Sequence, residues 1–61
     1  MFEAILLRVP HGVEFTLTPN GTDRFVKSSF DKRTKIYTLF CVSHPSLIVM
    51  IKHDTKVFLH V

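Results

Sequence analysis

This sequence lacks the residues for a covalent or metal cross-link within the chain. Its 61 residues include a single cysteine, Cys41, which excludes an internal disulfide. Its four histidines have neither the mutual spacing nor the cysteine partners of a structural zinc site. We therefore expect neither a metal nor a cofactor.

Long apolar runs are also missing. The longest, residues 47–51, falls far short of the ~20 residues that a membrane helix needs. The first residues do not form the basic and apolar leader that directs secretion. A lone cysteine suits a reducing compartment. We therefore expect a cytoplasmic, intracellular protein that does not enter a membrane.

Catalytic signatures are equally scarce. The sequence contains no G-x-S-x-G, H-E-x-x-H or P-loop pattern. Cys41 lies in an apolar segment, where a small thiol packs as a hydrophobic group, and the three aspartates fall in turn-like clusters. So short a chain has little interior for a water-excluded pocket. We expect a protein that is not an enzyme, with a site shared between subunits as the alternative.

Strand-like segments are what the sequence has in abundance, above all in residues 47–61. Two runs rich in β-branched and aromatic residues flank a polar turn at 53–55, which predicts a hairpin. A three-residue loop places Ile51 opposite Val57 and makes one face aliphatic. The other face then carries Ile48, Met50, Phe58 and His60.

Residues 2–18 predict another hairpin. A Pro-His-Gly turn separates two runs that alternate in polarity, with proline fixing φ and glycine suiting a left-handed position. A short helix over residues 3–8 is the alternative, because these residues are good helix formers. The Asn20-Gly21 pair suits a further tight turn, which would set Phe15 opposite Val26.

The third hairpin is expected over residues 24–43, with its turn at 31–33. Its register stays open. A three-residue loop places Val26 opposite Thr38, whereas a four-residue loop places it opposite Leu39, and both leave apolar groups on both faces.

These segments predict one all-β domain over residues 1–61, an antiparallel meander of about six short strands in three hairpins. It forms either an open sheet or a small barrel. Hydrophobic residues make up 46% of the chain, too much for the small interior that such a short chain can enclose. We therefore expect a homo-oligomer.

A basic segment carries the leading functional hypothesis. The net charge is +3, and between residues 24 and 35 Asp31 is the one acidic residue among five cations. Aromatic residues are interleaved with these cations, as in surfaces that hold a phosphate backbone and stack bases. A solvated hairpin whose lysines protect a sheet edge is the alternative. The expected contacts to RNA or DNA are Arg24, Lys27, Lys32, Arg33 and Lys35.

A protein-binding regulator or inhibitor is the second hypothesis. It would act through an exposed β edge, such as that of the C-terminal strand, which can accept a strand from a target. Alternatively, it would use an apolar patch. The expected interface residues are Ile48, Met50, Phe58 and His60.

Overall fold

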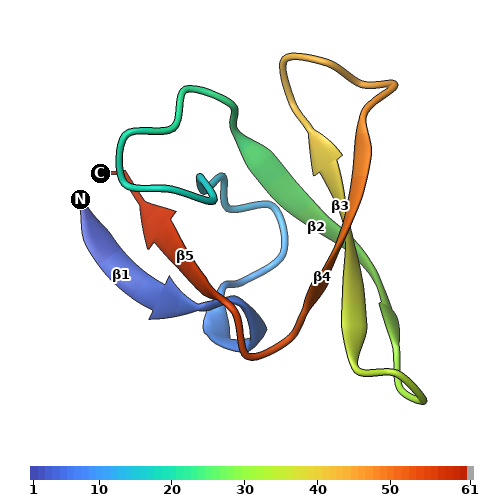
Figure 1. Cartoon of the computed structure of the whole chain (residues 1–61). Coiled ribbons are helices and arrows are strands. Elements are labelled where there is room, and N and C mark those ends of the chain that lie inside the picture. The colour runs from blue at the N-terminus through green and yellow to red at the C-terminus, as the bar shows by residue number, and fades with distance from the viewer. Residues whose placement is uncertain (61) are drawn as a thin grey trace.

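The structure, a computed structural model, describes residues 1–60 and is built from strands (Figure 1). They form two antiparallel sheets: sheet A pairs β1 with β5, and sheet B has the order β2-β3-β4. The all-β class is thus confirmed, with five strands where about six were expected. The elements are β1 (Phe2–Ile5), the 3-10 helix η1 (Leu6–Arg8), β2 (Phe25–Asp31), β3 (Ile36–Cys41), β4 (Ile48–Lys52) and β5 (Lys56–Leu59).

Of the three predicted hairpins, the one over residues 24–43 forms, as the β2–β3 hairpin. Its register differs from both alternatives, the three-residue and the four-residue loop. Phe30 lies opposite Tyr37, but Val26 lies opposite Phe40, because the register shifts at Ser28 and Ser29. Such a bulge puts an extra residue on one strand and changes which residues face each other. The loop has four residues, as one alternative had it, but it starts one position later than expected. That shift moves each partner along β3 by two positions, and the bulge takes one of these back.

The turn of this hairpin lies at residues 32–35, one position later than expected. The side-chain Oδ1 of Asp31 accepts a hydrogen bond from the Arg33 N–H at 2.9 Å, and its carbonyl accepts one from the Lys35 N–H at 2.7 Å. Lys35 adopts a left-handed φ of 59°, which lets the chain re-enter β3.

The predicted hairpin over residues 47–61 is wrong. β4 pairs with β3, and β5 pairs with β1, so the two runs belong to different sheets. The segment between them is a corner, because its backbone bonds to other elements. The His53 N–H donates to the Lys35 carbonyl at 3.0 Å, and the Thr55 carbonyl accepts from the Leu6 N–H at 2.9 Å. Val61, the end of the predicted strand, lies outside the described residues.

The predicted hairpin over residues 2–18 is also wrong, although its turn forms. The Val13 N–H donates to the Pro10 carbonyl at 3.3 Å, and Gly12 has a φ of 87°. The chain before this turn bends into η1, and the chain after it makes two isolated bridges. These join Phe15 to Phe25, one position from the expected Val26, and Thr16 to Phe58.

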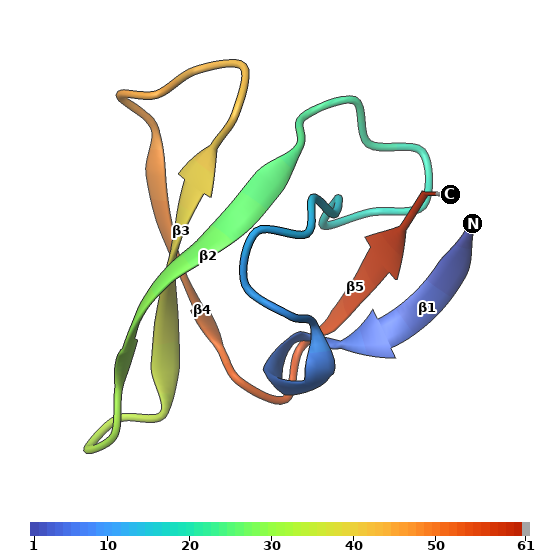
Figure 2. The same ribbon diagram turned by 180° about the vertical axis from the view of Figure 1, so that it is seen from behind.

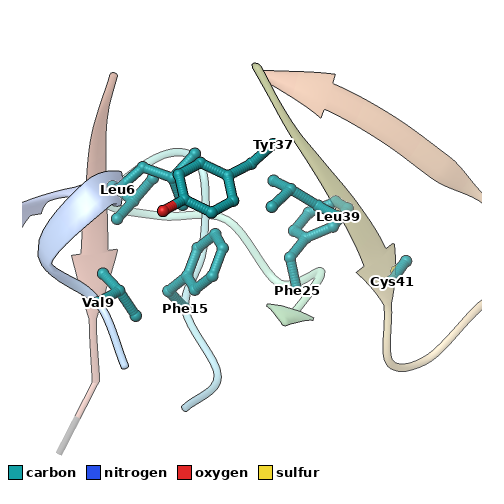
Figure 3. Packing of buried hydrophobic residues seen from close by; sticks show 8 residues of the cluster. Leu6, Val9, Phe15, Phe25, Tyr37, Leu39 and Cys41 are labelled. Atoms are coloured by element: carbon teal, nitrogen blue, oxygen red, sulfur yellow. The ribbon is translucent and has the colours of Figure 1, made fainter. Parts of the chain in front are cut away.

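These two bridges connect the sheets around one core (Figures 1 and 2). Phe15 is fully buried and lies between the residues near η1 and those of sheet B (Figure 3). Within residues 1–60, no helix is both long and apolar enough to cross a membrane. The buried hydrophobic residues are Leu6, Val9, Phe15, Phe25, Tyr37, Leu39, Cys41 and Val57.

Candidate nucleic-acid interface

Four exposed cations gather at one end of sheet B, and we call this cluster the basic tip. The β2–β3 turn projects away from sheet A in both views (Figures 1 and 2). Three cations lie on that turn, and the fourth lies at the end of β4. The residues of the basic tip are Lys32, Arg33, Lys35 and Lys52.

Lys52 joins the tip through strand pairing. It lies opposite Ile36, the first residue of β3, and the next residue, His53, bonds to the Lys35 carbonyl. Sequence reasoning missed Lys52 because it assigned β4 to a hairpin with β5. Lys52 can be assigned to the tip once β4 is known to pair with β3, and no local sequence pattern reveals that pairing.

Within residues 1–60, the cations of the tip form no ion pair. The ion pair that residues 1–60 contain joins Lys56 to Glu3 at 3.7 Å, on sheet A. The acidic residues of the two turns at the tip are Asp31 and Asp54, and the Asp31 carboxylate binds the Arg33 N–H. The four cations of the tip therefore outnumber the two carboxylates beside them. Exposed ammonium and guanidinium groups of this kind can contact phosphate.

An aromatic side chain lies beside the tip. Phe30 precedes the turn, and its side chain is 38% exposed. Its ring centroid lies 4.6 Å from that of the buried Tyr37, with the ring planes inclined at 39°. Phe30 is thus supported from within the fold and presents a ring on which a base can stack.

Lys27 is not on this surface. It is buried, with 7% of its area exposed. Its Nζ donates to the carbonyls of Leu6 at 3.1 Å, Leu7 at 3.4 Å and Val9 at 2.5 Å. It also lies 4.4 Å from the centroid of the Tyr37 ring, a cation–π contact. These contacts give Lys27 a structural role, holding η1 against sheet B, and leave none of its donors for a phosphate.

Arg24 lies far from the basic tip. It precedes β2, at the opposite end of that strand from the turn, and is half-buried. A strand of seven residues spans roughly 20 Å, so the same short segment of nucleic acid backbone does not reach both. The structure therefore brings together three of the five predicted contacts, adds Lys52, and separates Arg24 and Lys27 from them.

The residues predicted for a protein interface are also divided. Ile48 and Met50 lie on the outer face of β4, beside Phe40 of β3. Phe58 belongs to sheet A, where it is half-buried. His60 follows β5, and its Nε2 lies 2.7 Å from the Thr16 Oγ1. Because that hydroxyl already donates to the Thr18 carbonyl, Nε2 is the donor.

Other chemistry has little support in the described residues. No three His, Cys, Asp or Glu side chains among residues 1–60 come together as a metal site would require. The Cys41 thiol is buried, with its Sγ 3.4 Å from the Ser43 Oγ. A pocket in the loop before β2 has Asp23 as its one charged lining residue.

Comparisons of the chain with protein-family models, with curated proteins and with solved structures find no match. The fold and the tip define a small all-β protein with an exposed basic hairpin. Its function therefore has to be argued from that geometry.

Proposed function

We propose that this protein is a small, non-enzymatic nucleic-acid-binding protein whose basic tip contacts the phosphate backbone. The observation that carries the proposal is the cluster of four exposed cations at one end of sheet B, without ion-pair partners in residues 1–60. Lysine and arginine side chains in such a cluster release counterions when they neutralise phosphates, which drives binding.

The shape of the tip suits this role. A two-stranded ribbon is narrow enough to enter the major groove of a duplex, and the projecting turn can equally follow a single strand. Phe30 favours the single strand, because an exposed ring beside cations can stack on an unpaired base. The proposed contacts are Lys32, Arg33, Lys35 and Lys52 to phosphate, and Phe30 to a base.

Reversal of charge at the turn tests the proposal. In the double variant Lys32→Glu/Arg33→Glu, two of the four cations become acidic, so we expect affinity for a labelled single-stranded oligonucleotide to fall at least about tenfold at low salt. Fluorescence anisotropy measures this affinity. Both residues are exposed and outside the core, so circular dichroism should show an unchanged fold.

A matched control separates the tip from net charge. The double variant Arg8→Glu/Arg24→Glu makes the same charge change outside the tip, and circular dichroism checks its fold, since Arg24 is half-buried. We expect less than about a threefold loss, because neither side chain belongs to the tip, so that only the screened effect of the net charge remains. Equal losses in the two double variants, or no loss in the first, would contradict the proposal.

The second hypothesis is a protein-binding regulator or inhibitor. The edge expected for it, that of the C-terminal strand, is not free, because β5 pairs with β1 and Phe58 also bridges to Thr16. Support remains at Ile48 and Met50, since Phe58 and His60 lie elsewhere. A foreign strand could pair with the edge of β4. Binding of an unrelated extended peptide to this edge would support the second hypothesis.

A further inference from the structure

β4 is an apolar strand that this chain does not cover. Four of its five residues are apolar, yet none of the five is buried, whereas its neighbour β3 buries three of six. Ile48 and Met50 are 55% and 68% exposed on the outer face. Val49 and Ile51 are partly buried against the core on the inner face. An apolar edge strand with an exposed outer face is typical of an interaction surface.

The free backbone groups of β4 follow from its pairing with β3. The Cys41 N–H donates to the Leu47 carbonyl, and the His53 N–H donates to the Lys35 carbonyl. Hydrogen-bonded pairs alternate in an antiparallel ladder, so the odd-numbered residues of β4 bond to β3. The residues whose N–H and C=O groups point away from β3 are Ile48, Met50 and Lys52.

We propose that β4 pairs antiparallel with β4 of a second copy, with Met50 opposite the partner's Met50. This register overlaps all five residues of each strand. It also places the residues with free backbone N–H and C=O groups opposite one another. Met50 faces the partner's Met50, and Ile48 and Lys52 face the partner's Lys52 and Ile48. Each of these three pairs exchanges two hydrogen bonds. The result is a continuous six-stranded sheet about a two-fold axis.

The charges of β4 favour this register. Lys52 lies opposite the partner's Ile48, so like charges do not meet, and its methylene stem can cover the isoleucine. β4 also lacks the protection of most edge strands, since it carries no proline or bulge and its one charge lies at its end. The two basic tips then point in opposite directions along the sheet.

The size of this contact sets its strength. Two edges of five residues make a short contact, which we expect to bury less than the ~1,200 Å² at the lower limit of a standard interface. Because small interfaces are typically transient, we expect a reversible dimer with a dissociation constant on the order of micromolar.

Cysteine cross-linking tests the register. In an antiparallel hydrogen-bonded pair the two Cα atoms are about 5.5 Å apart, within the range of a disulfide. Met50→Cys should therefore form a covalent dimer under mild oxidation. Ile48→Cys is the matched control, since its two copies would be roughly 13 Å apart along the strands. The parent chain should not cross-link, because Cys41 is buried.

A proline variant tests the pairing itself. Met50→Pro removes an N–H that β3 does not use, and proline is tolerated at such edge positions, so the fold should persist while dimerisation weakens about tenfold. Met50→Leu keeps the N–H and should dimerise like the parent. Sedimentation equilibrium measures both.

Three results would overturn the inference. They are a parent chain that stays monomeric at high micromolar concentration, cross-linking of Ile48→Cys as fast as that of Met50→Cys, and a monomer whose β4 edge instead binds an unrelated extended peptide. None of them bears on the charge reversals at the tip, so the two proposals can fail separately.

Discussion

At the scale of single residues, Lys27 shows how a charge that sequence reasoning assigned to a surface can serve the interior. Its ammonium bonds to three carbonyls at and after η1 and lies over the Tyr37 ring. A buried ammonium requires such a set of partners, because an unpaired charge in the core is very costly. Alternation alone could not distinguish Lys27 from the exposed lysines of the same hairpin.

Lys27→Met should lower the free energy of unfolding by about 1–3 kcal/mol, because burying the carbonyls without their donor has a cost of that order. Urea denaturation followed by circular dichroism measures the change. Lys32→Met is the control, since that side chain is exposed and its replacement should change stability by less than about 0.5 kcal/mol. A Lys27→Met variant as stable as the parent would contradict the structural role.

Lys35 offers a second prediction at this scale. Its φ of 59° strains any residue with a Cβ, at a cost of about 1–2 kcal/mol, which glycine avoids. Lys35→Gly should therefore raise the free energy of unfolding by up to about 1 kcal/mol, while Lys35→Val should lower it. Thermal denaturation checks both, and a destabilised glycine variant would show that the turn does not adopt this conformation in solution.

At the scale of elements, the sequence identified strand-forming residues well and their partners poorly. The β2–β3 hairpin is local, so turn chemistry and alternation could predict it. The pairing of β1 with β5 joins residues more than 50 positions apart, and no local pattern encodes it. The corner at residues 53–55 resembles a hairpin turn in composition, but its backbone is bonded by Leu6, Leu7 and Lys35.

Hydrogen exchange in β4 gives a prediction about this element. The amides of Val49 and Ile51 bond to β3 and should exchange slowly at every protein concentration. The amide of Met50 faces outward and should exchange fast in dilute solution, then slow down as dimers form. NMR at two concentrations resolves the alternation, and equal protection of the three amides in dilute solution would contradict the assigned ladder.

At the scale of the whole molecule, the composition predicts that apolar side chains remain exposed, and the fold shows where they lie. A short chain that is 46% hydrophobic cannot bury all of its apolar side chains. The exposed ones are spread over the chain, and the two on the edge strand β4 are Ile48 and Met50. The candidate site was anticipated in part. Lys32, Arg33 and Lys35 follow from the hairpin, whereas Lys52 requires a strand pairing that the sequence does not reveal.

The central claim is that four cations of the basic tip bind phosphates, and the salt dependence of binding tests it most directly. The affinity of the parent chain for a single-stranded oligonucleotide is measured by anisotropy at about 50 mM and 200 mM salt. Four phosphate contacts predict a slope near −2.8, hence a loss of about 50-fold over this range. Absence of binding at 50 mM, or an affinity unchanged between the two salts, would contradict the claim.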